Sequence, residues 1–320
     1  MHIARYVLLT ALSLFAASAM ARACPQPWLG AENGAEDCLV KVMPVRSWMS
    51  TRGASFPLNV PIRSGYLKEN PAVPFKGNII YYQGLSDSML NHLPLFQKLT
   101  NAGYRVIAFD YMGQGGSGGE LENMRIYSIL EMGRHFWQLH GRELEKFPKR
   151  FVIGWSIGGL AAYIQASQQR AGVVVLLAPG IQPHWLVGEQ YPSEWRLGQI
   201  TMRTLTSQVY DGQVLDPHVD PIRPGSILEA ISFWVDYLQT ATQTQYRPMP
   251  YSSKGLVYLT GPRDTYVNID KTREVLNHRA PHFKIMEYPS ALHEIDNEVP
   301  MISQRLQEDI LTFFESQPHY

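Results

Sequence analysis

A serine, an acid and a histidine stand, in that order along the chain, just after segments that read as strands. Ser156 lies in a Gly-x-Ser-x-Gly motif bounded by Gly154 and Gly158, between the apolar run 151–154 and a helix-like stretch, 157–168. A strand that turns sharply into a helix lifts a serine hydroxyl above the sheet, and the helix N-terminus directs free N–H groups at developing negative charge. The two glycines lack a Cβ, so strand and helix can approach each other within the turn. The motif predicts that Ser156 is the nucleophile of an acyl-transfer reaction; a glycine-rich turn that happens to hold a serine is the alternative.

A serine nucleophile needs a general base, and the base needs an acid that orients it. Asp264 and His293 occur in the loops after two further predicted strands. Loops at the carboxyl ends of parallel strands lie along one edge of a sheet, so these side chains can meet the serine there. We therefore expect His293 to be the general base and Asp264 to hold its tautomer. Asp270 and Asp296 are alternative acids, but neither directly follows a strand.

Acyl transfer also needs two backbone N–H donors that stabilise the oxyanion. The first is the N–H of Ile157, directly after the nucleophile. The second should come from the loop after the first predicted parallel strand, residues 83–88. The N–H of Leu85 is our candidate, because Gly84 permits a tight turn there. A strand-to-helix loop without a catalytic role is the alternative.

The elements that would position these groups alternate along most of the chain. The expected strands are 59–67, 78–82, 105–110, 151–154, 173–177, 255–260 and 282–288, and the expected helices are 92–100, 127–146, 157–168, 268–278 and 301–314. Alternating strands and helices imply parallel βαβ units that are covered on both faces. The predicted fold class is therefore α/β, with a mostly parallel central sheet, helices on both faces and a helical cap insertion.

The chain divides into four predicted parts. Residues 1–23 read as a signal peptide, and residues 24–60, which are rich in proline and glycine, read as an N-terminal extension. The core takes residues 61–180 and 251–320, and residues 181–250 form a cap, or lid. The cap interrupts the alternation with aromatic residues and prolines, and an apolar slot beneath it would suit an acyl chain.

The N-terminus has a positive charge, an apolar stretch and small residues at A-x-A spacing, which is typical of a secretory signal peptide. A membrane anchor that stays attached is the alternative. Cleavage after Ala23 would leave Cys24 first. Two exclusive outcomes follow: a Cys24–Cys38 disulfide, or a lipidated Cys24 in a sequence that resembles a bacterial lipoprotein box. The expected location is the periplasm or cell envelope, either free or as a membrane-anchored lipoprotein.

A glycine-rich loop follows the predicted strand 105–110. Its pattern resembles, in register, the D-x-x-G-x-G-x-S-x-G signature of α/β-hydrolases in the monoacylglycerol lipase and lysophospholipase group, which is serine aminopeptidase S33-like. The matching residues are Asp110, Gly113, Gly115, Ser117 and Gly119. The same loop formally contains G-x-G-x-x-G, but no helix begins cleanly after it, so we expect no dinucleotide and no other cofactor.

Two further motifs carry this resemblance, which spans roughly residues 60–316. The nucleophile turn matches at Gly154, Ser156, Gly158 and Gly159, and the last motif matches at His293-Glu294 and Asn297-Glu298. Two positions depart from the group, because Gln83 and Trp155 stand where it has histidine. The resemblance implies an α/β-hydrolase fold and an acyl-lipid substrate, while the two departures leave the particular substrate open.

We therefore predict an exported serine carboxylic-ester hydrolase, of the lysophospholipase or monoacylglycerol lipase kind. It would cleave single-chain acyl lipids through an acyl-serine intermediate and contact a membrane surface through the cap or a lipidated Cys24. A thioesterase, peptidase or acyltransferase of the same fold is the first alternative. A non-catalytic hydrolase-like binding protein is the alternative from another class.

Charge and histidine spacing exclude other classes of partner. Lysine plus arginine equals aspartate plus glutamate, 28 against 28, so nucleic acid is not expected. No metal is expected either, because His184 and His218 lie beside prolines without a ligand motif. His135 and His140 are five residues apart on the long predicted helix and are interpreted as surface residues.

Overall fold

The fold is seen in a computed structural model that describes residues 27–30, 39–46, 57–85, 87–142, 151–184 and 231–317. The predicted signal peptide, both cysteines and residues 185–230 of the predicted cap lie outside these residues. The strands of the described part are β1 (Leu39–Arg46), β2 (Pro57–Leu67), β3 (Gly77–Tyr82), β4 (Tyr104–Phe109), β5 (Phe151–Trp155), β6 (Val173–Leu177), β7 (Lys254–Leu259) and β8 (Lys284–Glu287).

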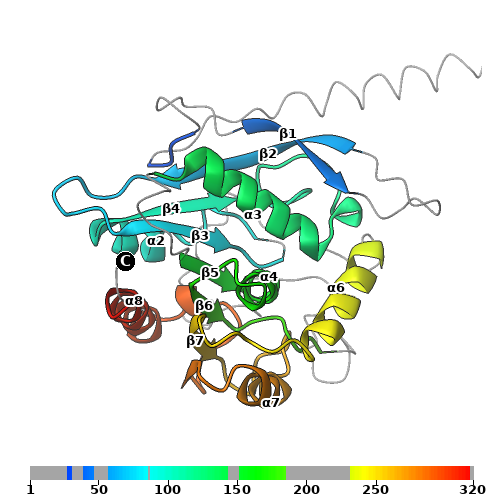
Figure 1. Ribbon diagram of the computed structural model, residues 1–320, viewed down its shortest axis with the longest axis vertical. Helices are drawn as coiled ribbons and strands as arrows, with labels where there is room; N and C mark the ends of the chain where they lie inside the picture. Colours follow the sequence, from blue (N-terminus) through cyan, green and yellow to red (C-terminus); the bar gives the residue numbers. More distant parts are fainter. Residues whose placement is uncertain are drawn as a thin grey trace, which may run out of the picture.

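These strands form one sheet, in the order β1-β2-β4-β3-β5-β6-β7-β8 (Figure 1). The pairs β1–β2 and β2–β4 are antiparallel, and every pair from β4 to β8 is parallel. The carboxyl ends of the parallel strands therefore share one edge of the sheet, where side chains in the following loops can converge. The predicted mostly parallel sheet is confirmed.

Helices cover both faces of the sheet, because alternate strand residues point to opposite sides. The α-helices of the described part are α2 (Leu93–Asn101), α3 (Ile126–His140), α4 (Ile157–Ser167), α6 (Ile231–Thr244), α7 (Ile269–Arg279) and α8 (Pro300–Glu315). Ile79 and Tyr81 of β3 pack with α2 and α8, whereas Ile80 and Tyr82 pack with α3 and α4. Burial of each such side chain stabilises the fold by about 1.5–3 kcal/mol, so the β3 pattern alone determines the register of both layers.

The helix α3 is shorter than predicted, and one of its histidines is buried where a surface residue was expected. It ends at His140 rather than 146, because Gly141 adopts an extended conformation while its N–H still donates to Trp137 O. His140, interpreted as a surface residue, is buried: it lies four residues after the buried Phe136, and its Nε2 lies 3.0 Å from Ser64 Oγ. Burial lowers the pKa of His140 to about 4, so it is neutral.

Two features border the core. Trp28 packs edge-on against Phe96 of α2, with ring centroids 5.6 Å apart, and Leu29 forms an antiparallel bridge with Tyr66 of β2. The segment 27–30 therefore contributes to the α2 side of the core. None of the described helices is both long enough and apolar enough to cross a membrane.

Candidate active site

Ser156 occupies a strained turn between β5 and α4. Its backbone has φ 54° and ψ −119°, a conformation that a residue with a Cβ adopts only when its surroundings enforce it. A Cβ on Gly154 would overlap the backbone of Gly158, and a Cβ on Gly158 would overlap the carbonyl of Tyr82. The Gly180 N–H donates to Ser156 O over 2.7 Å and fixes the turn from outside. Both motif glycines therefore allow backbone to lie against backbone, as the sequence predicted.

The structure brings Ser156, His293 and Asp264 into one hydrogen-bonded chain. His293 Nε2 lies 2.7 Å from Ser156 Oγ, and His293 Nδ1 lies 2.8 Å from Asp264 Oδ2. An ionised carboxylate only accepts, so Nδ1–H donates to Asp264 and leaves Nε2 to accept from the serine hydroxyl. The three residues come from loops that follow β5, β7 and β8. This tautomer and this spacing are those that proton transfer from Ser156 to His293 requires.

Asp264 is held as a charged acceptor. Thr260 Oγ1 donates to Oδ2 over 2.5 Å, while the N–H groups of Tyr266 and Val267 donate to Oδ1 over 2.9 and 3.0 Å. Burial by itself would raise the pKa of Asp264, but the charge of His293 and these hydrogen bonds hold that pKa below its ordinary value. Asp264 therefore stays ionised beside the histidine.

The loop that carries Leu85 lies against the start of α4, where Ile157 is the first residue. A Cβ on Gly158 would also overlap Gln83 O, so the start of α4 lies directly against the loop that carries Leu85. Among the described residues, no hydrogen bond uses the backbone N–H of Leu85 or of Ile157. Both N–H groups are therefore available to an oxyanion: one directly follows Ser156 and the other belongs to the adjoining loop.

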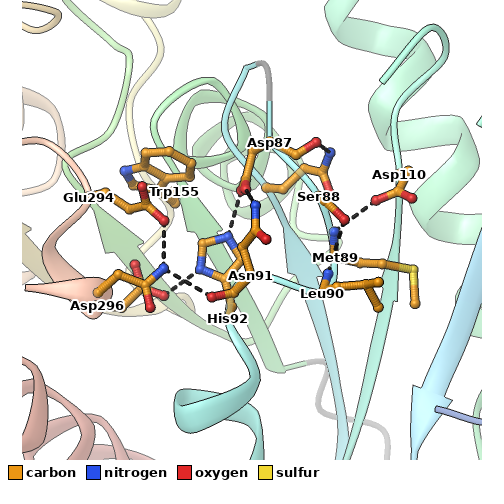
Figure 2. Close-up of polar contacts among 12 residues, drawn as sticks. Asp87, Ser88, Met89, Leu90, Asn91, His92, Asp110, Trp155, Glu294 and Asp296 are labelled. Atoms are coloured by element: carbon orange, nitrogen blue, oxygen red, sulfur yellow. Dashed lines mark hydrogen bonds and ion pairs between the residues drawn. The ribbon is translucent and has the colours of Figure 1, made fainter. Parts of the chain in front are cut away.

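The acid of the glycine-rich loop holds the oxyanion loop in place. Asp110 Oδ1 accepts from the Met89 N–H over 2.8 Å, as Figure 2 shows. Its Oδ2 accepts from Arg63 Nε over 2.5 Å and from the Gly116 N–H over 2.9 Å, and Arg63 Nη2 reaches Ser88 Oγ over 2.9 Å. Asp110 is fully buried, so this pairing is needed to offset its desolvation. The glycine-rich loop therefore supports the loop that carries Leu85.

Trp155, which stands where related motifs have histidine, supports the loop of the base. Its Nε1–H donates to His293 O over 2.8 Å. The imidazole of His293 lies between two aromatic rings, with centroids 5.5 Å from Trp155 and 4.8 Å from Tyr266. Glu298 Oε1 accepts from the Leu292 N–H over 2.7 Å and holds the loop from the other side. The backbone of this loop is thus held by Trp155 and Glu298, and the imidazole contacts two aromatic rings.

Gly84 has a different role from the predicted one. It was expected to permit a tight turn, but its φ lies outside the left-handed region. A Cβ at this position would instead overlap the six-membered ring of Trp155. Glycine is therefore required because the indole packs flat against the oxyanion loop, a tertiary contact that the local sequence does not reveal.

One polar cluster next to the site was missed by sequence reasoning. Asp296, an alternative acid for His293, lies instead 2.6 Å from Nδ1 of His92, and Asp87 lies 2.5 Å from Nε2 of the same ring. The other alternative acid, Asp270, is exposed and pairs with Arg273. Asp296 and His92 are 204 residues apart, so no local motif could have joined them.

The described part of the predicted cap is α6. Tyr237 OH donates to Gly180 O over 3.2 Å, just beyond the turn that holds the nucleophile. Asp236 Oδ2 accepts from the Ile126 N–H, over 2.8 Å, at the start of α3. The helix α6 therefore lies near the start of α3 (Figure 1) and contacts the segment beside the serine turn, while residues 185–230 lie outside the described residues.

Sequence comparison identifies a family. The profile of the family described as serine aminopeptidase, S33, matches residues 74–300, a segment that contains Ser156, Asp264 and His293. No curated protein matches the chain.

Solved structures resemble the chain in fold. The monoacylglycerol lipase of Paleococcus ferrophilus is 18% identical with a TM-score of 0.61, covering 81% of this chain and 99% of that one. A soluble variant of monoglyceride lipase from Saccharomyces cerevisiae, in complex with a substrate analog, is 15% identical with a TM-score of 0.64, covering 81% and 92%. A thermostable carboxyl esterase from Bacillus coagulans, in complex with glycerol, is 16% identical with a TM-score of 0.59, covering 87% and 97%. These likenesses confirm the predicted α/β-hydrolase fold.

Proposed function

Because the chain belongs to the serine aminopeptidase S33 family of hydrolases, we propose that it is a serine carboxylic-ester hydrolase with Ser156 as nucleophile. The observation that carries this proposal is the continuous chain from Ser156 Oγ through His293 to Asp264, at 2.7 and 2.8 Å. The strained turn and the two unpaired N–H groups beside it supply the other parts that acyl transfer needs.

The proposed reaction proceeds in two halves. His293 Nε2 takes the proton of Ser156 Oγ while the oxygen attacks the ester carbonyl carbon, and the negative oxygen binds the N–H groups of Leu85 and Ile157. The tetrahedral intermediate expels the alcohol, which receives the proton from His293. A water molecule, deprotonated by the same nitrogen, then attacks the acyl-serine. The bond to Ser156 Oγ breaks, His293 returns the proton to that oxygen, and the acid is released. Asp264 stabilises the imidazolium in both halves without taking its proton.

The first experiment replaces the nucleophile. We expect Ser156→Ala to lower kcat/KM for a chromogenic short-chain ester by more than about 10³-fold, because no other group can form the acyl intermediate. It should also abolish labelling by a fluorophosphonate probe. Ser167→Ala, a serine of α4 whose hydroxyl donates to Ile164 O, is the matched control and should retain labelling. A folded Ser156→Ala variant that keeps kcat/KM within about tenfold of the wild type would refute the assignment.

We further propose that the substrates are single-chain acyl lipids, either lysophospholipids or monoacylglycerols. The monoacylglycerol lipase and the monoglyceride lipase among the structural relatives support an acyl-lipid substrate, as does the aromatic helix α6 beside the serine turn. The experiment compares kcat/KM for a lysophospholipid, a monoacylglycerol, an acyl thioester and an aminoacyl anilide, with Ser156→Ala as blank. Preference for the anilide would indicate a peptidase, and preference for the thioester a thioesterase.

We propose further that the protein is exported to the cell envelope. The support is the N-terminal pattern of residues 1–23. Mass spectrometry of the mature N-terminus tests it. An acylated Cys24 indicates a lipoprotein, whereas a Cys24 without an acyl group that is bonded to Cys38 indicates the disulfide. An N-terminus that still begins at Met1 in exported fractions would contradict cleavage.

A further inference from the structure

A cluster of four ionisable side chains lies behind the catalytic loops, on the face of the sheet that α2 and α8 cover. Asp87, His92, Glu294 and Asp296 are each at most 2% exposed (Figure 2). Asp87 belongs to the oxyanion loop, and His92 directly precedes α2. Glu294 and Asp296 follow the proposed base His293: Glu294 directly precedes the 3₁₀ turn η4 (Ile295–Asn297), and Asp296 lies within it. The cluster therefore joins the loop of the proposed oxyanion donor to the loop of the proposed base.

His92 has a carboxylate on each ring nitrogen. Nε2 lies 2.5 Å from Asp87 Oδ2, and Nδ1 lies 2.6 Å from Asp296 Oδ2. Ionised carboxylates only accept, so both ring nitrogens must donate and the ring is an imidazolium. Burial would lower the pKa of His92, but the two carboxylates hold that pKa well above its ordinary value.

A bound metal ion would be a different explanation of the cluster. Ligand atoms of Asp87, His92 and Glu294 lie within 4.8 Å of one another. Two ligands of one tetrahedral ion, each about 2.0–2.1 Å from it, would be roughly 3.3 Å apart. The 2.5 Å between His92 Nε2 and Asp87 Oδ2 leaves room for a shared proton and not for an ion. The geometry therefore favours an ionic hydrogen bond over coordination.

Trp155 links this cluster to the reacting groups. Its ring centroid lies 5.7 Å from that of His92 and 5.5 Å from that of His293. Its Nε1–H donates to His293 O, and its six-membered ring fills the place of a Cβ on Gly84. A displacement of His92 would therefore reach both catalytic loops through one rigid indole.

We infer that His92 is a positioning residue: as an imidazolium between Asp87 and Asp296, it ties the oxyanion loop to the base loop and fixes Leu85 N–H relative to His293. This inference rests on the proposed function of the site. The two ionic hydrogen bonds and Trp155 act together as one brace, which we call the His92 brace. Its members are Asp87, His92, Asp296 and Trp155.

The brace should weaken in alkali. The titratable groups that face His92 are Asp87, Asp296, Glu294 and Tyr81, whose ring centroid lies 4.7 Å from that of His92. Because the folded pKa of His92 is raised, its contribution to folding is complete below the unfolded value of about 6.5 and is lost as pH rises through the folded pKa. Burial and Asp87 also raise the pKa of Glu294, so the contribution of Glu294 to folding stability likewise falls as pH rises through its folded pKa. Both groups therefore predict loss of the brace at high pH.

The experiment compares His92→Gln with the matched control His278→Gln, an exposed histidine of α7. For a soluble ester, we expect His92→Gln to lower kcat at least about tenfold with KM changed less than about twofold, since misplaced catalytic groups affect the chemical step. The alkaline loss of activity expected of the wild type from deprotonation of His92 should be absent from His92→Gln. His278→Gln should match the wild type in all three measurements.

Asp296→Asn keeps the experiment decisive if His92→Gln fails to fold. Its amide oxygen still accepts from Nδ1–H, so the fold should survive, while the lost charge should lower kcat about threefold to tenfold. Folded variants with wild-type kcat and pH profile would overturn the inference. So would a stoichiometric divalent metal, measured by elemental analysis, that is lost in His92→Gln. If the wild type itself is not labelled by fluorophosphonate, the proposed function fails and the inference fails with it.

Discussion

Two histidines of this protein have similar surroundings, yet we propose opposite roles for them. His293 and His92 are both buried, at 2% and 0% exposed, and each has a carboxylate on one ring nitrogen. They differ at the second nitrogen, where His293 faces the Ser156 hydroxyl and His92 faces another carboxylate. A hydroxyl can give up its proton to a histidine, whereas a second carboxylate holds the histidine in its charged form. The partner of the second nitrogen, and not burial, separates a base from a fixed cation.

The largest difference between the two histidines is expected when the aspartate beside each one is replaced by asparagine. We expect Asp264→Asn to lower kcat about 10⁴-fold, because the amide can donate to Nδ1 and hold His293 in the wrong tautomer. Asp296→Asn should lower kcat by about tenfold at most, because it disturbs only the position of the loop. Steady-state kinetics with a chromogenic ester measures both. Equal losses in the two variants would contradict the division of roles.

A second variant tests the indole that joins the two histidines. We expect Gly84→Ala to destabilise the fold by about 1–3 kcal/mol, because its Cβ would overlap the Trp155 ring, and to lower kcat about 100-fold by shifting the oxyanion loop. Chemical denaturation and ester kinetics measure the two effects.

The matched test for this contact is a double-mutant cycle. Trp155→Phe shortens the ring and removes the hydrogen bond to His293 O. If the overlap is the cause, the double variant should lose less stability than the sum of the single variants. Strict additivity would show that Gly84 and Trp155 do not interact as described.

The smallest effect is expected at Thr260, whose hydroxyl donates to Asp264 and not to His293. Removing the hydroxyl in Thr260→Val should lower kcat about threefold to tenfold and raise the pKa of Asp264, because the lost hydrogen bond is one of those that lower it. Since the pKa of Asp264 is depressed, its contribution to stability is lost as pH falls through the folded value. Acid unfolding should therefore begin at higher pH in Thr260→Val.

Thr260→Ser, which keeps the hydroxyl, is the control for this variant. It should retain the wild-type pH dependence of the free energy of unfolding, measured by denaturant titration at several pH values. An unchanged acid limb in Thr260→Val would show that the hydroxyl does not influence Asp264.

Sequence alone was sufficient where function depends on local order along the chain. The strand–turn–helix at Ser156, and a loop residue after each of two later strands, are local patterns, and parallel strands bring their ends together. The mostly parallel α/β sheet followed from the same alternation, and the α/β-hydrolase fold from the resemblance of the motifs. The contact of Asp296 with His92 depends instead on residues 204 positions apart. Gly84 and Trp155 likewise meet only in the folded state, and the burial of His140 follows from where α3 lies on the sheet.

The position of the base near the end of the chain has a consequence for biosynthesis. Ser156 and His293 are 137 residues apart, and the segment 293–298 also supplies Asp296 to the His92 brace and is followed by α8. A chain that emerges from its N-terminus carries a complete serine turn and oxyanion loop long before it has a base. A chain that ends before residue 293 lacks the proposed base and the Asp296 side of the His92 brace, and we therefore expect it to be inert.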